Sequence, residues 1–143
     1  IFGVMTGCRQ ANLLNLEVRD VDFTRDTVLF RDPKHGPDYT VDIHPDMREM
    51  LAMRCEGESS NSKVFNFRNK DDLWTAFKKV RDYVDLPKSL VWHSLRHTTG
   101  SWLAEREVPV QTIAKVLGHK TLEMSMRYTH VSDKARKTAI SKL

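Results

Sequence analysis

Side chains that bind phosphate and move protons recur in the last third of the sequence. His93, Arg96 and His97 occupy positions i, i+3 and i+4, so a helix places them on one face. His119 and Tyr128 follow further along the chain. A guanidinium meets phosphate with paired donors, an imidazole transfers protons near neutral pH, and a deprotonated tyrosine can attack phosphorus. The pattern therefore predicts a phosphate site with a nucleophile beside it.

Short helices are expected to hold these side chains in place. Apolar residues at helical spacing predict helices over 93–106 and 110–117, and Gly118 is suited to end the second of them. A third, shorter helix is expected to begin with Thr121 as its N-cap and to run to about Tyr128. The candidate residues would then lie on neighbouring helices and on the turns between them.

The preceding part of the chain is expected to be mainly helical, with one small antiparallel sheet. Runs rich in β-branched and aromatic residues predict three short strands joined by turns, over 21–23, 28–30 and 39–43. Helical patterns cover four further segments: 1–5, 9–16, 45–53 and 71–84. In the last of these the apolar residues recur at the spacing of an amphipathic helix: Leu73, Phe77, Val80 and Val84.

Two cations stand beside predicted turns. Arg9 follows the break at Thr6-Gly7-Cys8 and opens a short helix, where backbone N–H groups favour anions. Lys34 lies at the tip of the hairpin between the second and third strands. Taken alone, each has the properties of an exposed cation next to a turn, so a functional role needs support from the rest of the pattern.

Three linked motifs resemble the C-terminal half of the tyrosine recombinases, the phage integrase family. They are His93-x-x-Arg96, Leu117-Gly118-His119 and Arg127-Tyr128-Thr129-His130, in the family's order and at compatible distances. Thr6-Gly7-x-Arg9 matches the family's first arginine motif, so the resemblance spans nearly the whole chain. Asn12 departs from it, because the family usually carries Glu there. An amide can hydrogen-bond but cannot orient a guanidinium through charge.

The resemblance implies the catalytic fold of the DNA breaking-rejoining enzymes and the activity of a site-specific DNA recombinase or integrase. Such an enzyme cleaves and rejoins DNA strands through a 3′-phosphotyrosyl intermediate, without a metal, ATP or any other cofactor. The family's catalytic residues fall on six positions of this sequence: Arg9, Lys34, His93, Arg96, His119 and Tyr128.

The chemistry gives the arginines and the tyrosine their expected roles. Arg9 and Arg96 would clamp the non-bridging phosphate oxygens and stabilise the transition state. Tyr128 would attack phosphorus. Because the free pKa of a phenol is ~10, Tyr128 needs a base, and His93 is the expected one. His119 would donate to a phosphate oxygen or assist the same proton transfer.

The remaining cations and imidazoles are assigned by position. The family places its catalytic lysine in the hairpin, and Lys34 is the only lysine there, so it is the expected general acid for the departing 5′ oxygen. His35 is the alternative if the alignment slips by one residue. His97 is assigned to structure, because the family uses His93 and Arg96 on that turn. His130 is also assigned to structure, because it follows Tyr128 too closely to share its site easily.

The chain is expected to form one catalytic domain over residues 1–143. Because its first residue lies inside an apolar run, it is expected to lack its first helix or helices and the family's N-terminal DNA-binding domain. Residues 132–143 form a C-terminal tail whose apolar residues suit a short helix that docks in cis or on a neighbour. The expected partners are double-stranded DNA and other protomers in a synaptic complex.

Composition is compatible with a DNA-binding domain. The formal net charge of +4 and a pI near 9.2 permit binding to a polyanion. Cys8 and Cys55 provide neither zinc-ligand spacing nor a disulfide framework. No apolar run approaches the ~20 residues of a membrane span, and no signal peptide opens the sequence. We therefore expect no membrane partner and a cytoplasmic location.

Three alternatives stay open on the sequence. His93 and His97 have the spacing of a helical zinc pair, although Ser94 stands where a metalloprotease carries Glu. A DNA-binding module could keep the fold without the activity. A type IB topoisomerase uses similar chemistry but reseals the strand that it cut.

Overall fold

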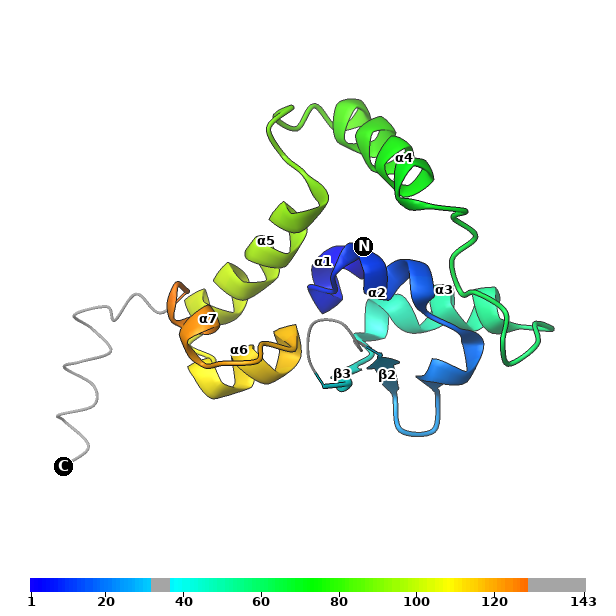
Figure 1. Ribbon diagram of the computed structural model, residues 1–143, viewed down its shortest axis with the longest axis horizontal. Helices are drawn as coiled ribbons and strands as arrows, with labels where there is room; N and C mark the ends of the chain where they lie inside the picture. The colour runs from blue at the N-terminus through cyan, green and yellow to red at the C-terminus, as the bar shows by residue number, and fades with distance from the viewer. Residues whose placement is uncertain (32–36, 129–143) are drawn as a thin grey trace, which may run out of the picture.

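The computed structural model describes residues 1–31 and 37–128 (Figure 1). The predictions for Lys34, His35, His130 and the tail over 132–143 lie outside the described residues. Within the described part the chain is mainly helical and contains a three-stranded antiparallel sheet, so the predicted fold class is confirmed. None of the described helices is both long enough and apolar enough to cross a membrane.

The elements follow one another in two groups. The first group surrounds the sheet: α1 (Phe2–Thr6), α2 (Gln10–Asn15), the 3-10 helix η1 (Val18–Asp20), β1 (Val21–Asp22), β2 (Thr27–Phe30), β3 (Tyr39–Asp42) and α3 (Pro45–Cys55). The second group is helical: α4 (Lys70–Tyr83), α5 (Trp92–Glu105), α6 (Val110–Leu117) and α7 (Glu123–Met126). Figure 1 shows α5, α6 and α7 together on one side of the molecule.

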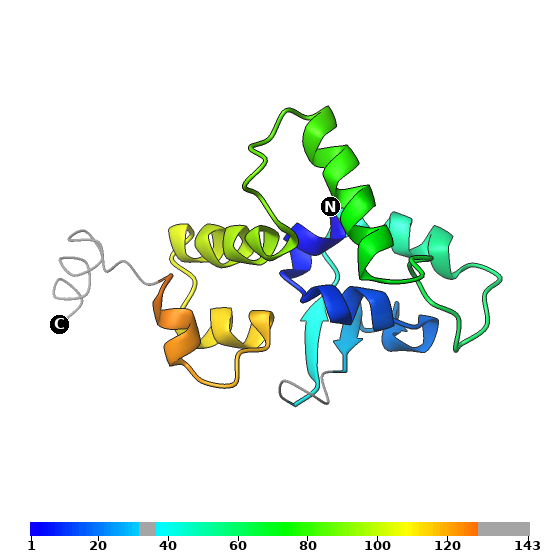
Figure 2. The same cartoon turned by 45° about the horizontal axis from the view of Figure 1, so that its top comes forward.

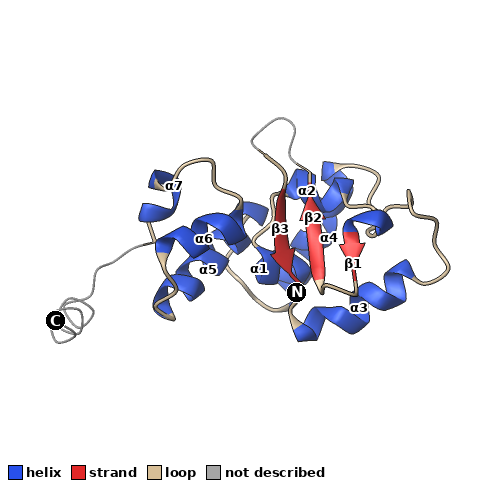
Figure 3. Cartoon of the chain, turned by 90° about the horizontal axis from the view of Figure 1, so that it is seen from below, coloured by secondary structure: helices blue, strands red, loops and turns tan. Residues whose placement is uncertain are grey.

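The sheet is a meander in the order β1-β2-β3, seen in Figure 3. Val28 in the middle strand pairs with Val21 on one side and with Val41 on the other. Val28 and Phe30 alternate with half-buried neighbours and face the core, as expected of a strand with one covered face. The predicted strands agree with the observed ones to within one residue at each end.

Two apolar clusters stabilise the fold. The larger one joins α1, α2, the sheet and α3, and includes Phe2, Leu13, Leu16, Phe30, Met47 and Leu51. The smaller one consists of Ile113, Leu117 and Tyr128, with Leu103, Ala104 and Val108 packed around them. Helix α1 packs against α5 and connects the two halves of the molecule (Figure 2). The candidate nucleophile is therefore part of the packing of the helical half.

Helix α4 forms where the periodicity predicts it, but its apolar face is only partly covered. Leu73 near its start is buried, whereas Val80 and Val84 are 63% and 51% exposed. In Figure 1 the second half of α4 points away from the sheet. Spacing predicted the helix correctly, but it could not predict how much of its apolar face other elements would cover.

The start of α7 differs from the expected one. Its N-cap is Leu122 without a side-chain cap, so the prediction of Thr121 as N-cap is wrong. Thr121 instead offers its backbone carbonyl to the N–H of Met124 at 3.3 Å, within the turn that leads into the helix. Because α7 ends at Met126, Tyr128 lies in the turn that follows the helix.

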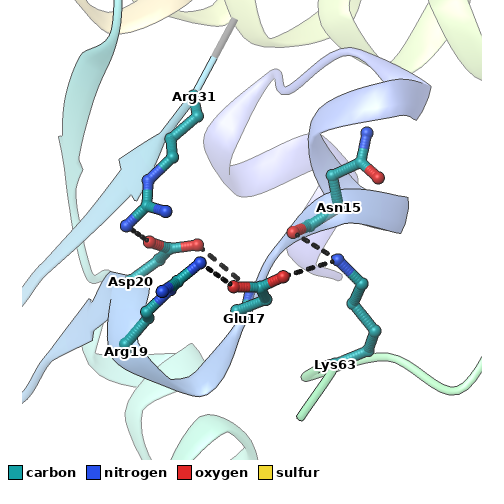
Figure 4. Close-up of polar contacts among 6 residues, drawn as sticks. All are labelled: Asn15, Glu17, Arg19, Asp20, Arg31 and Lys63. Carbon is teal, nitrogen blue, oxygen red and sulfur yellow. Dashed lines mark hydrogen bonds and ion pairs between the residues drawn. The ribbon is translucent and has the colours of Figure 1, made fainter. Parts of the chain in front are cut away.

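A polar cluster fixes the end of β2 against η1 (Figure 4). Asp20, whose side chain is 4% exposed, pairs with Arg31 at 2.5 Å and accepts the backbone N–H of Glu17 at 3.1 Å. Glu17 in turn contacts Arg19 at 2.7 Å and Lys63 at 3.0 Å. The cluster therefore fixes the end of β2 and the following Arg31 against η1.

Candidate active site

Five of the six predicted catalytic residues line one cavity of about 110 Å³. The start of α2, helix α5 and the segment around α7 provide its walls. Its lining side chains are Arg9, His93, Arg96, His97, His119, Met124, Arg127 and Tyr128. The sixth predicted residue, Lys34, lies outside the described part of the chain. Residues far apart in the sequence thus converge on a site that carries three guanidiniums and three imidazoles.

Arg96 is a buried cation with one donor left over. Arg96 is 3% exposed, and its Nη1 donates to the backbone carbonyl of Gly7 at 2.8 Å. Nη2 is also buried and has no hydrogen-bond partner among the described residues. Burial, and then the nearby Arg9 guanidinium, lower the pKa of Arg96 from its ordinary value. A buried charge with an unused donor favours an anion at this position.

Arg9 reaches the same place through a tight turn. Gly7 ends α1 with φ 60°, a left-handed conformation that favours glycine, and a Cβ there would lie 2.5 Å from Cδ2 of Leu117. The chain then enters α2 with Arg9 as the N-cap residue. Nη2 of Arg9 donates to the carbonyl of Gly118 at 3.2 Å. The turn therefore brings the second guanidinium to the cavity and also supplies the carbonyl that binds Arg96.

Asn12 stands where the family usually carries Glu, and its described side-chain hydrogen bond goes to the backbone of Arg31. It is 5% exposed, and its Nδ2 donates to the carbonyl of Arg31 at 3.2 Å. Arg31 is thus held on both sides, through its carbonyl by Asn12 and through its guanidinium by Asp20. The amide couples the helix that follows Arg9 to the end of β2.

Tyr128 lies almost fully buried, with 8% of its surface exposed. Its ring lies against Gly100 of α5 so closely that a Cβ on Gly100 would be 2.6 Å from Cζ. Its hydroxyl lies 3.0 Å from Nδ1 of His97. Burial raises the pKa of Tyr128, although Arg96 and Arg127 act in the opposite direction. The hydroxyl is therefore protonated at neutral pH, and an attack on phosphorus requires a base.

His119 is fixed beside the tyrosine. Its Nδ1 lies 2.5 Å from Oγ of the buried Ser125, and its ring is parallel to that of Tyr128 at 6.4 Å between centroids. Burial, followed by the charges of Arg96, Arg9 and Arg127, lowers the pKa of His119 to about 4. At neutral pH this imidazole is uncharged and keeps one N–H to donate.

His93 opens onto the cavity from the first turn of α5. Its ring meets that of His97 edge-on, with centroids 4.7 Å apart. Burial lowers its pKa first, and His97 and then the arginines lower it further. A neutral imidazole in this position could accept a proton or donate one to an anion bound in the cavity.

The contact between His97 and Tyr128 does not follow from the sequence. The resemblance assigns His97 to structure, yet this residue is the one whose ring nitrogen meets the tyrosine hydroxyl. The i, i+4 spacing placed His93 and His97 on one face, which was the available signal. Spacing could not show which of the two meets Tyr128, because that depends on how the turn after α7 packs against α5.

The described side chains include no group of three or more His, Cys, Asp or Glu residues arranged to hold a metal ion. His93 and His97 therefore lack a third ligand within that part of the chain. The zinc alternative gains no support from this geometry.

The chain is similar to proteins that recombine DNA. The model of the phage integrase family matches residues 2–135. Tyrosine recombinase XerA of Pyrococcus horikoshii is 30% identical over 145 residues, which cover 95% of this chain and 50% of the relative. The chain spans about half the length of the curated relatives it matches.

Two solved structures share the fold. The catalytic domain of bacteriophage HP1 integrase superposes with a TM-score of 0.73 at 25% identity, over 98% of this chain and 77% of that one. XerH site-specific recombinase bound to its difH substrate gives a TM-score of 0.79 at 20% identity, over 98% and 44% of the two chains. At 20% identity, the similarity to XerH shows only that the two proteins share a fold.

Proposed function

Because this chain belongs to the phage integrase family, we propose that it is the catalytic domain of a site-specific DNA recombinase. One observation supports this most strongly. The buried guanidinium of Arg96, with an unused donor, shares a cavity with Arg9, His119 and the hydroxyl-bearing ring of Tyr128. The proposed domain covers residues 1–143, and the rest of the recombinase would supply the DNA-clamping domain.

Double-stranded DNA is the proposed substrate. Arg9, Arg96 and Arg127 give the cavity the positive charge that a phosphodiester requires, and the chain carries a net charge of +4. The Tn1549 transposon integrase, which has the same fold, was solved in complex with a circular intermediate DNA. We place the reaction in the cytoplasm of the cell that holds the DNA, as the sequence also predicts.

The reaction conserves the energy of the phosphodiester. Arg9 and Arg96 hold the non-bridging oxygens while Tyr128 attacks phosphorus, and the 5′ oxygen leaves with a proton from Lys34. The product is a 3′-phosphotyrosyl bond, which a 5′ hydroxyl from another strand then attacks. His119 donates its N–H to a phosphate oxygen, and an imidazole of the cavity serves as the base, a role for which the sequence predicts His93. No nucleotide hydrolysis is needed, because the ester energy is stored in the covalent bond.

Trapping on nicked DNA tests the function. The substrate is a pool of duplexes with randomised sequence around a nick, because the phosphate chemistry is separate from the base contacts that choose a site. After cleavage next to the nick, the short fragment diffuses away and religation fails. We expect a covalent protein–DNA adduct, and peptide mapping should place the DNA on Tyr128.

The same experiment separates the alternatives. Absence of any adduct, together with tight DNA binding, would indicate a non-catalytic module of the same fold. An adduct that reseals only its own strand when an intact duplex is used would indicate a type IB topoisomerase-like activity. Transfer to a second duplex supports the recombinase.

Replacing Lys34 with Ala should slow cleavage of ordinary DNA and leave cleavage of a 5′-bridging sulfur substrate nearly unchanged. A thiolate is a good leaving group that needs no proton, whereas general acid catalysis contributes roughly 10²–10⁴-fold for an oxygen leaving group. Single-turnover rates on the two substrates provide the measurement. His35→Ala is the matched variant from the same hairpin, and rescue confined to it would move the role to His35.

We also propose that other protomers of the same protein join the DNA complex, through the C-terminal tail over 132–143. Truncation after Ser132 should lower self-association or cleavage, because a short apolar helix is stable only when docked. Sedimentation velocity and the trapping yield measure the two effects. If both stay at their full-length values, the tail has no part in assembly.

A further inference from the structure

The hydroxyl of Tyr128 has one described hydrogen-bond partner, Nδ1 of His97 at 3.0 Å. This distance lies within the 2.6–3.2 Å or so at which a general base takes a proton. The ring of Tyr128 is fixed by its contact with Gly100, one turn along the same helix, so the hydroxyl is held in this direction. Helix α5 therefore carries both the surface against which the tyrosine ring packs and the group that meets its proton.

The other two imidazoles are engaged differently. Nδ1 of His119 is hydrogen-bonded with Oγ of Ser125, and the imidazole ring of His119 lies parallel to the ring of Tyr128. His93 contacts the ring of His97 edge-on, and no hydrogen bond to Tyr128 is found for it among the described residues. Both are better placed to meet the oxygens of a bound phosphate than to receive the proton of Tyr128.

Positive charge surrounds the contact between His97 and Tyr128. Arg9 at the start of α2, Arg96 on α5 and Arg127 after α7 line the same cavity and oppose a further positive charge there. The same cations contribute to the lowered pKa values of His93 and His119. A phosphodiester bound between these arginines would therefore lie in the same cavity as His97 and Tyr128.

We propose that His97 is the general base that accepts the proton of Tyr128, a role that rests on the function proposed above. The O–H bond of Tyr128 breaks and its proton passes to Nδ1 of His97. The phenolic oxygen bonds to phosphorus as the bond from phosphorus to the 5′ oxygen breaks, and that oxygen takes a proton from the general acid, Lys34. In the rejoining step His97 returns the proton to Tyr128. His93 is then free to hold a phosphate oxygen.

His97→Asn isolates the proton transfer. The amide of Asn can still hydrogen-bond from about the position of Nδ1, but it cannot take a proton. The substrate is a nicked duplex of the sequence recovered by trapping, with a 5′-bridging sulfur, so that the rate does not depend on the general acid. We expect single-turnover cleavage to fall by about 10²–10⁴-fold. Ser101→Asn, at an exposed position on the same helix, should cleave at the wild-type rate.

The pH profile separates a base from a residue that only holds the tyrosine. The wild-type rate should become independent of pH at high pH, because a bound base takes the proton of Tyr128. The rate of His97→Asn should keep rising about tenfold per pH unit, because the phenol must then ionise unaided. The buried groups near the arginines do not interfere below pH 10, since burial raises the pKa of Cys8 to about 11 and that of Tyr39 to about 12. His93→Asn, which removes the other titrating imidazole of that face, should keep the wild-type shape.

Each result decides between the proposals. Wild-type cleavage rates in His97→Asn, or a profile that levels off in that variant but not in His93→Asn, would overturn the role of His97. If thermal unfolding shows that His97→Asn does not fold, His97→Gln provides the same comparison. Failure of the wild-type chain to form any adduct would instead contradict the recombinase function, so the two failures are distinguishable.

Discussion

Replacing Tyr128 with Phe is expected to abolish covalent linkage to DNA while leaving the fold and DNA binding nearly intact. The substitution removes a single oxygen, whose described hydrogen bond goes to His97. The ring keeps its contacts with Gly100 and Leu117. Loss of one hydrogen bond costs about 1 kcal/mol, so the free energy of unfolding should change little. The trapping assay, with denaturant unfolding and a DNA-binding titration, measures the three quantities.

Tyr83→Phe is the matched control for this variant. Tyr83 is 90% exposed at the end of α4, away from the cavity. It should trap DNA as the unchanged chain does. Adducts that persist in Tyr128→Phe at the wild-type level would show that another residue is the nucleophile.

Replacing Arg96 with Lys should reduce the single-turnover cleavage rate about a hundredfold or more. The guanidinium would serve two partners at once, because Nη1 donates to the Gly7 carbonyl while Nη2 remains for the proposed phosphate contact. A lysine ammonium is a point charge without this planar fork. Loss of one preorganised contact to the transition state corresponds to roughly 3 kcal/mol. Arg9→Lys is expected to behave in the same way, with a loss that chelators neither cause nor relieve.

Arg81→Lys controls for the change in a buried guanidinium. Arg81 is 6% exposed in α4 and donates to the carbonyl of Lys88 at 2.9 Å, remote from the cavity. This variant should lose stability but cleave at the normal rate. Near-normal rates in both Arg9→Lys and Arg96→Lys would rule out the clamp. Loss of activity with EDTA that zinc restores would favour a hydrolase.

Local pattern predicted most of the fold. Helix α6 runs from Val110 to Leu117 as expected, because a strong apolar stripe ends at a glycine with φ 60°. The strands followed from β-branched runs separated by turns. Two features were not predictable in this way: Val84 is half exposed, and α7 starts after Leu122 without a cap from Thr121. Both depend on where other elements lie. Periodicity indicates which side of a helix is apolar, and tertiary packing decides what covers it.

The candidate active site was also predictable only in part. The resemblance to the phage integrase family pointed to Arg9, Arg96, His119 and Tyr128, and the structure places all four around one cavity. Their fine geometry was not encoded in the spacing. His97 meets Tyr128 across 31 positions of sequence, and the contact exists because Gly100 lets the ring approach α5. A close approach of this kind can be seen only once the helices are placed in space.

The turn at Gly7 ties both arginines of the clamp to a common reference point. Its carbonyl anchors Arg96, and the chain that leaves it supplies Arg9, which reaches across to Gly118. Because Arg9 lies two residues after Gly7 and Arg96 is bonded to the Gly7 carbonyl, a substitution at Gly7 would disturb both guanidiniums at once. This one left-handed turn therefore sets the positions of both candidate phosphate contacts.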